Sequence, residues 1–135
     1  SADEFFLMAS HPRSTIALAA RGAGILAIDS PFFGLVIDVD GLIREARKVK
    51  LMGFTGKLLV HPRHVDPVNQ VFSPSQEEID FARRVIKAYE EAKARGLGAT
   101  SFGGRMIDYG YYRRALNLID IAEKISEREK RKSQS

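Results

Sequence analysis

Polar side chains that could bind a substrate or move a proton follow two short apolar runs of the sequence. Asp29 and Ser30 follow the run at residues 25–28, and His61 follows the run at residues 58–60. Apolar runs of this length, bounded by Gly or Pro, are typical of strands that are buried on both faces in a parallel sheet. Active sites gather at the carboxyl ends of such strands, so we expect these side chains to face one site. The alternatives are a turn role for the aspartate and a structural loop role for the histidine.

Asp108 is the best candidate for acid–base chemistry. It follows the pair Gly103-Gly104, which we interpret as a hinge, and it stands at the start of the last predicted helix. The helix dipole stabilises an ionised carboxylate at this end. A carboxylate on a mobile segment can also close over a site and exclude water from it. The alternative is a helix-initiating acid with no catalytic role.

The segment at residues 72–75 opens a long helix and is a candidate anion site. Free backbone N–H groups and the dipole at a helix N-terminus favour a group such as a phosphate. Plain helix capping is the alternative interpretation. Ser75 and Glu78 have capping-box spacing, and Ser73 followed by Pro74 is a second possible cap.

The elements that must position these residues alternate along the chain. Helical apolar spacing occurs near residues 13–21, at residues 42–52 and at residues 79–92, and a final amphipathic helix follows Asp108. The order is therefore α-β-α-β-α-α, with about thirty residues from strand to strand, as in a βαβ unit. Two neighbouring strands leave open edges with unmatched backbone groups, so the chain needs further strands from another segment or subunit.

Composition narrows the class of protein. The chain has 135 residues, of which 44% are hydrophobic and 28% are charged, as is typical of one globular domain. The absence of cysteine excludes disulfides, thiolate metal ligands and cysteine nucleophiles. No apolar stretch is long enough to span a membrane and no signal peptide is visible, so we expect a cytoplasmic protein. The net charge of +4 comes mostly from residues 128–132, which we interpret as a solvated helix end.

An ordered series of short motifs resembles the citrate lyase β-subunit and malyl-CoA lyase family, whose members make or break a carbon–carbon bond in CoA thioesters. The resemblance covers about Arg13 to Ala122. It rests chiefly on these motifs at their spacings: Arg13-Ser14, Ala27-Ile28-Asp29, Gly53-Phe54-Thr55-Gly56-Lys57, His61-Pro62, Phe72-Ser73-Pro74-Ser75 and Met106-Ile107-Asp108. Two positions depart from the family pattern: Gly103 stands where many relatives have Asp, and Arg63 follows the His-Pro pair where many relatives differ.

The resemblance implies an α/β fold, namely the C-terminal part of a (β/α)₈ TIM barrel with a C-terminal helical lid. The last two βα units would occupy residues 1–96, the lid residues 97–126 and a disordered basic tail residues 127–135. The family's other strands would supply the Glu and Asp that hold Mg²⁺ and an Arg for the substrate carboxylate. We therefore expect no metal ligand in this segment and no activity from the chain alone.

The resemblance also implies roles for single residues and for partners. Asp108 matches an aspartate that closes over a neighbouring subunit and handles the proton in aldol chemistry. Six residues are expected to contact the CoA thioester: Asp29, Ser30, His61, Pro62, Phe72 and Ser73. The expected partners are the rest of the barrel, an acyl-CoA and further copies in a homotrimer or hexamer, with no nucleic acid and no membrane. The alternative function is a non-catalytic half-barrel that binds acyl-CoA or a partner chain.

Overall fold

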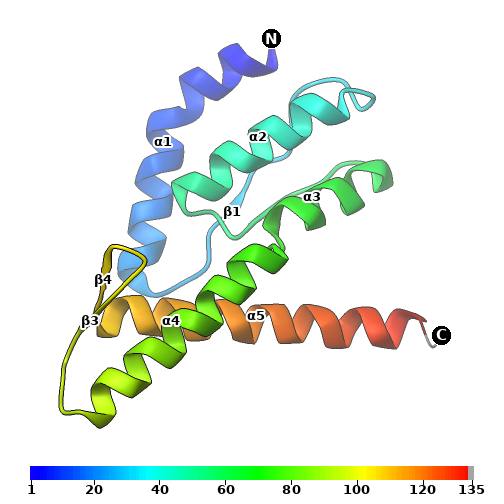
Figure 1. Ribbon diagram of the computed structural model, residues 1–135. Coiled ribbons are helices and arrows are strands. Elements are labelled where there is room, and N and C mark those ends of the chain that lie inside the picture. The colour runs from blue at the N-terminus through cyan, green and yellow to red at the C-terminus, as the bar shows by residue number, and fades with distance from the viewer. Residues whose placement is uncertain (134–135) are drawn as a thin grey trace. The chain divides into compact units, whose positions relative to one another are not determined.

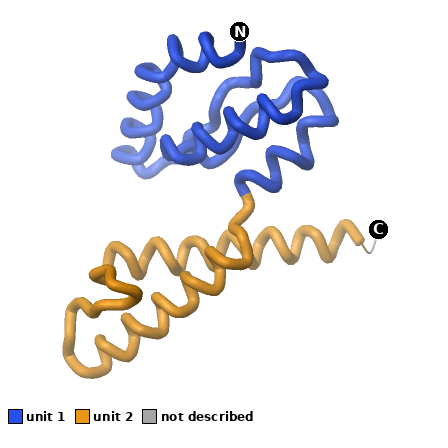
Figure 2. Tube along the Cα trace, turned by 45° about the horizontal axis from the view of Figure 1, so that its top comes forward, with its two compact units in different colours: residues 1–72 blue, residues 73–135 orange. Residues whose placement is uncertain are grey.

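In the computed structural model, the described residues are 1–133, and the chain divides into two compact units that we describe separately. Unit 1 comprises Ser1–Phe72, and unit 2 comprises Ser73–Ser135 (Figure 2). This boundary differs from the one expected after residue 96. The reason is that the helix following Ser75 packs along the C-terminal helix and so belongs to the second unit.

Unit 1 alternates helices with short strands (Figure 1). Its elements are α1 (Ala2–Ala23), β1 (Ile28–Asp29), α2 (Val39–Met52), β2 (Gly56–Lys57), the 3₁₀ helix η1 (Pro62–His64) and α3 (Val65–Phe72). Local capping sets the bounds of α2. Its N-cap Asp38 accepts a hydrogen bond from the N–H of Gly41 at 2.9 Å, and it ends at Gly53, which has the left-handed φ of 107°.

Two helical segments differ from the sequence prediction. α1 begins at Ala2 rather than near Arg13, because Ser1 and Glu4 form a capping box that starts the helix earlier. The segment after residue 61, for which the sequence predicts no helix, contains η1 and α3. Pro67 did not prevent this helix because it lies in the first turn of α3, where a missing N–H removes no helical hydrogen bond.

β1 and β2 are parallel neighbours, as the sequence predicts. Ile28 lies opposite Gly56, and Asp29 lies opposite Lys57. Each strand has only two residues, and β2 precedes the expected run at residues 58–60. Hydrogen bonds outside the strands extend the pairing, since the N–H of Leu58 donates to the carbonyl of Asp29 at 2.9 Å.

The two faces of this strand pair differ in burial. Side chains alternate along a strand, and here Ala27, Asp29 and Lys57 are buried on the face that α1 and α2 cover. The other face exposes four large apolar side chains: Leu26, Ile28, Leu58 and Val60. The expectation of burial on both faces is therefore wrong for this chain taken by itself, because helices cover only one face.

Small side chains allow the helices of unit 1 to pack closely on the strands. One buried cluster contains Ala17, Ala20, Ala27, Val49 and Phe54. A second contains Phe32, Leu42 and Val68. Phe32 comes from the loop after β1, so this second cluster fixes part of that loop against α2 and α3.

Unit 2 is a helix–hairpin–helix arrangement. Its elements are α4 (Gln76–Ala94), β3 (Thr100–Phe102), β4 (Arg105–Ile107) and α5 (Tyr109–Ser133). Of the two caps considered for α4, Ser75 is correct, since its Oγ accepts from the N–H of Glu78 at 3.1 Å. The buried core of the unit joins both helices and the hairpin: Ala82, Val85, Tyr89, Ile107 and Ala115.

Two expectations for unit 2 need correction. Gly103 and Gly104 were expected to form a hinge, but they form the tight turn of the antiparallel β3–β4 hairpin, with φ of 58° and 74°. The basic tail was expected to be disordered from residue 127, but α5 continues to Ser133, while residues 134–135 lie outside the described residues. Within residues 1–133, none of the helices combines the length and apolar character needed to cross a membrane.

Candidate functional site

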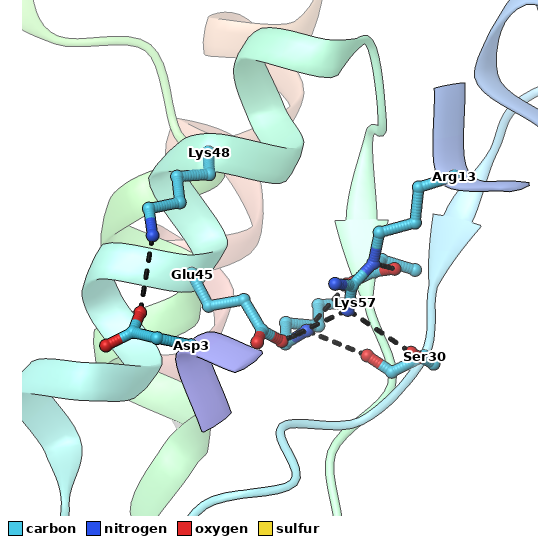
Figure 3. Close-up of polar contacts among 7 residues, drawn as sticks. Asp3, Arg13, Ser30, Glu45, Lys48 and Lys57 are labelled. Atoms are coloured by element: carbon cyan, nitrogen blue, oxygen red, sulfur yellow. Dashed lines mark hydrogen bonds and ion pairs between the residues drawn. The ribbon is translucent and has the colours of Figure 1, made fainter. Parts of the chain in front are cut away.

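Four charged side chains meet where β1 and β2 end, and we call them the charge cluster: Arg13 of α1, Asp29 of β1, Glu45 of α2 and Lys57 of β2 (Figure 3). Arg13 donates to both oxygens of Asp29, from Nε at 2.8 Å and from Nη2 at 3.1 Å. Nζ of Lys57 lies 2.6 Å from an oxygen of Asp29 and 2.6 Å from an oxygen of Glu45. Nη2 of Arg13 also donates to Glu45 at 3.2 Å. Each of the four elements thus contributes one charge to a single junction.

The charge cluster is buried and balanced. The side chains of Arg13, Glu45 and Lys57 are 5%, 4% and 0% exposed. Two cations face two carboxylates, so the interior holds no net charge, and removal of any one member would leave a buried charge uncompensated. Nη1 of Arg13 and Oε2 of Glu45 make no hydrogen bond within residues 1–133, although the ring of Phe6 lies 4.8 Å from the guanidinium carbon.

The cluster also holds Ser30, the first residue after β1. Nζ of Lys57 donates to the carbonyl oxygen of Ser30 at 2.8 Å, and Nη2 of Arg13 lies 3.4 Å from its Oγ. Lys57 therefore makes three hydrogen bonds, which is all that an ammonium group can donate. Asp29 is buried with both oxygens bonded to cations, and its predicted contact with CoA stays a prediction.

A second contact holds the same loop further along. His64 of η1 is 1% exposed, and its Nε2 lies 3.0 Å from the carbonyl oxygen of Val36. The β1–α2 loop, residues 30–38, is therefore tied near both ends to residues that belong to β2 or follow it. Between these ties, Phe33 and Leu35 are exposed.

His61 lies in the loop after β2, Pro62 is the first residue of η1, and both are exposed. Nδ1 of His61 accepts a hydrogen bond from the N–H of Arg63 at 3.1 Å, so the imidazole caps η1. This contact is the structural role considered as the alternative for His61. It leaves the residue at the carboxyl edge of the strands, where the CoA contact was predicted.

Phe72 and Ser73 lie at the junction of the two units, and both are partly buried. The first free N–H groups of α4 lie further on, and Ser75 caps them. The local geometry is therefore that of a capped helix, which was the alternative interpretation of this segment. The predicted phosphate contact stays a prediction.

Asp108 is exposed and caps α5. Its Oδ1 accepts from the N–H of Tyr111 at 2.8 Å, and its carbonyl oxygen accepts from the N–H of Tyr112 at 3.0 Å. The capping role weighed against catalysis is thus present. Asp108 can cap the helix and still act as a catalytic carboxylate. It is exposed, and only its Oδ1 binds the helix N-terminus, which leaves Oδ2 for a substrate.

One tyrosine next to this cap has a shifted pKa. The hydroxyl of Tyr112 donates to Oε1 of Glu90 at 3.1 Å, and this hydrogen bond to a carboxylate raises the pKa of Tyr112 above its usual value of 10.0. Its ring stacks on Tyr89, with 4.6 Å between the centroids. Tyr112 therefore connects α5 to α4 in its protonated form.

Sequence reasoning missed four residues of this region: Arg13, Glu45, Lys57 and His64. Arg13 and Lys57 stand in motifs that carried the family resemblance, and a lysine ending a strand in an apolar context could have marked a buried pair. Glu45 and His64 gave no local signal, because their partners are 12 and 28 residues away in the chain.

The described residues do not form a metal site of their own. Across residues 1–133, no group of three or more His, Cys, Asp or Glu side chains is arranged to hold a metal ion. The acidic members of the charge cluster are already paired with Arg13 and Lys57. This donor set does not fit Mg²⁺.

Comparison with known proteins identifies the family. A family model of carbon–carbon bond lyases of the TIM-barrel fold matches residues 13–123. The chain belongs to this family. The match confirms both the resemblance seen in the sequence and the TIM-barrel class of the fold.

Individual relatives agree with this assignment. Citrate lyase subunit beta from Leuconostoc mesenteroides subsp. cremoris is 41% identical over 112 residues, which are 83% of this chain and 37% of that protein. The L-malyl-CoA/beta-methylmalyl-CoA lyase of Cereibacter sphaeroides (strain ATCC 17025) is 40% identical over 114 residues, or 84% of this chain and 36% of that protein. The chain thus spans little more than a third of these curated relatives.

The fold of this chain is also similar to that of a solved structure. The protein CitE from Mycobacterium tuberculosis, determined in complex with magnesium, acetoacetate and coenzyme A, is similar with a TM-score of 0.73 and 35% identity. The similarity covers 86% of this chain and 42% of that one.

Proposed function

We propose that this chain supplies the last two βα units and the C-terminal lid of a Mg²⁺-dependent carbon–carbon lyase that acts on CoA thioesters of the malyl, methylmalyl or citryl type. The observation that carries this proposal is the two-sided character of the β1–β2 pair. Helices cover one face, and the other exposes four apolar side chains: Leu26, Ile28, Leu58 and Val60. A barrel wall is built in this way, with helices outside and packed apolar layers inside.

The remaining strands must come from a segment other than residues 1–133. Support comes from the length of the relatives, of which this chain matches 36–37%. We call the chain together with that segment the complete protein. In the complete protein the metal ligands and the arginine for the substrate carboxylate lie outside residues 1–133, and the assembly is a homotrimer or hexamer.

The loops at the carboxyl edge contact the CoA thioester. Ser30 and His61 follow β1 and β2 at this edge. Pro62, Phe72 and Ser73 are the further contacts of this proposal. Asp29 acts through Ser30 as well as by any direct contact, since its carboxylate is bonded to the two cations that also hold Ser30.

Asp108 handles the proton. In aldol cleavage the β-hydroxyl group gives up its proton and becomes the carbonyl of one fragment, while the carbon–carbon bond breaks and its electron pair passes to the thioester enolate. The enolate carbon then takes up a proton. An exposed carboxylate on the lid can be brought to that carbon without disturbing the buried core of unit 2. Its helix cap survives ionisation, because the N–H of Tyr111 bonds to the carboxylate.

The test is Asp108→Asn in the complete protein. Turnover of the CoA thioester should fall by about 10²-fold or more, since proton transfer typically contributes about 10²–10⁴-fold, while binding of the thioester changes little. Asparagine caps helices as well as aspartate does, so α5 should begin normally. The matched control is Asp120→Asn, which makes the same change at an exposed carboxylate of the same helix, paired with Lys124 at 2.7 Å.

Three further results would test the alternatives. Wild-type turnover in Asp108→Asn would reduce this residue to a helix cap. A complete protein that binds acyl-CoA but cleaves none of the three thioester types would favour the non-catalytic half-barrel. If the lid serves a neighbouring subunit, mixing Asp108→Asn subunits with subunits disabled at the metal site should restore part of the activity.

A further inference from the structure

We propose that Lys57 is a positioning residue which, together with His64, holds the β1–α2 loop in the conformation that receives the CoA thioester. This inference rests on the proposed function, which places the thioester at the carboxyl edge of the strands. It assigns a role to two residues that sequence reasoning did not select.

The hydrogen bonds of Lys57 divide into two kinds. Two of them, to Asp29 and Glu45 at 2.6 Å each, pair the ammonium with carboxylates. The third, at 2.8 Å, goes to the backbone carbonyl of Ser30. This third bond does not change the balance of formal charge in the cluster, but it fixes the first peptide of the β1–α2 loop.

His64 supplies the second tie. Its Nε2 lies 3.0 Å from the carbonyl oxygen of Val36, near the far end of the same loop. Phe32 packs between the two ties against Leu42 and Val68, and it is 5% exposed. Two hydrogen bonds and this packing contact therefore link the loop after β1 to β2 and the segment that follows it, and these segments form the edge on which a barrel binds its substrate.

Holding a binding loop in place lowers the cost of ordering it when the ligand binds. Loss of the tie should therefore weaken binding of the thioester more than it slows the chemical step. The expected signature is a raised KM with a nearly unchanged kcat. A role in stability alone would change neither constant in the fraction of protein that remains folded.

The first experiment uses Lys57→Met in the complete protein, with Lys48→Met as the matched control. Lys48 is an exposed lysine of α2, with Nζ 3.4 Å from Asp3. Hydrogen exchange of the peptide spanning residues 30–38 should become about 3- to 10-fold faster in Lys57→Met, as expected for the loss of the one hydrogen bond that Lys57 donates to this loop. The KM for the CoA thioester should rise by about the same factor, and Lys48→Met should change neither.

A second variant separates positioning from charge balance. Lys57→Met leaves one uncompensated negative charge in the cluster, which also threatens folding. The double variant Lys57→Met/Glu45→Gln restores the balance of formal charge, with Arg13 facing Asp29, but still lacks the ammonium that donates to the carbonyl oxygen of Ser30. Its melting temperature should recover towards wild type, while loop exchange stays fast and KM stays high.

The outcomes are distinct. Recovery of loop exchange and KM together with stability in the double variant would show that Lys57 only balances charge, and would overturn the proposal. Unchanged exchange and KM in Lys57→Met would do the same. Fast exchange confined to the loop, in a complete protein that cleaves no CoA thioester, would overturn the proposed function while supporting the hold of Lys57 on the loop.

Discussion

Different kinds of interaction stabilise the interior of each of the two units. In unit 1, buried cations and carboxylates join α1, β1, α2 and β2, and the apolar packing around them uses mostly small side chains such as Ala17 and Ala20. In unit 2, apolar and aromatic side chains such as Val85 and Tyr89 fill the contact between α4 and α5. Its ion pairs, such as Lys124 with Asp120, lie on the surface.

This difference indicates how precisely each unit must fix its geometry. Replacing a buried ion cluster with apolar side chains is often neutral or stabilising, so such a cluster is weak evidence for stability. It does demand one geometry, because each charge must meet its partner. Unit 1 carries the strand edge and the loop after β1, where geometry matters, whereas unit 2 needs only a packed helix pair to present Asp108.

The largest loss of stability is expected for Arg13→Met in unit 1, compared with Arg84→Met in unit 2. Arg13→Met leaves two carboxylates facing one lysine in the interior, and breaking a buried pair typically costs about 3–5 kcal/mol. Arg84 of unit 2 is also near an aromatic ring, with its guanidinium carbon 5.9 Å from the centroid of Phe102, but it is exposed. Arg84→Met should therefore cost at most about 1 kcal/mol.

Urea denaturation of the complete protein, followed by hydrogen exchange to locate the loss, provides the measurement. Protection should fall in α1, α2 and the strands for Arg13→Met, with unit 2 unaffected. Equal losses of stability for Arg13→Met and Arg84→Met would mean that unit 1 does not depend on its buried charges more than unit 2 depends on its surface charges.

A smaller effect is expected at the hairpin turn of unit 2. Gly104 has φ of 74°, in the left-handed region, so Gly104→Ala should destabilise the hairpin by about 1–2 kcal/mol. Gly98 is the control, because its φ is not in that region and an added Cβ would meet nothing within 4 Å. Hydrogen exchange in β3 and β4 should quicken for Gly104→Ala only. Equal behaviour of the two variants would mean that the left-handed φ of Gly104 does not limit the stability of the hairpin.

Much of the fold could be predicted from the sequence because its signals are local. The capping box at Ser75 and Glu78 and the stop at Gly53 follow from nearby residues. The parallel pairing of the strands follows from the repeat of about thirty residues between two short apolar runs. α3 was not predicted, although Pro62 and Pro67 occupy first-turn positions of η1 and α3, where helices tolerate proline. The hairpin was missed because three-residue strands give almost no alternation of apolar and polar residues.

The candidate site was harder to predict, because its most constrained residues interact across long sequence separations. Asp29 was found from its place after an apolar run, but its partners Arg13 and Lys57 lie 16 and 28 residues away. The tie between His64 and Val36 also requires the folded chain. Which of the predicted residues touch a CoA thioester depends on a ligand and on strands outside residues 1–133, so those roles stay predictions.

The smallest effect concerns the surface bond between Tyr112 and Glu90, and it has a definite pH dependence. The pKa of Tyr112 is raised, chiefly by the hydrogen bond to Glu90, so the bond's contribution to stability is fully present below the usual pKa of 10.0. It is lost as pH rises through the higher pKa of the folded state. Tyr112→Phe should therefore lower the melting temperature slightly at pH 7, and the difference from wild type should shrink above pH 10.

Glu90→Gln is the matched background for this measurement. It removes the carboxylate that raises the pKa, so Tyr112→Phe made in Glu90→Gln should show a much weaker dependence on alkaline pH. Because Tyr112 also stacks on Tyr89, the phenylalanine keeps the ring contact and isolates the hydroxyl. A difference that grows above pH 10 would mean that the ionised phenolate is the form bound in the folded state. The polar surface bonds of unit 2 would then contribute to its stability in a way that its apolar core does not explain.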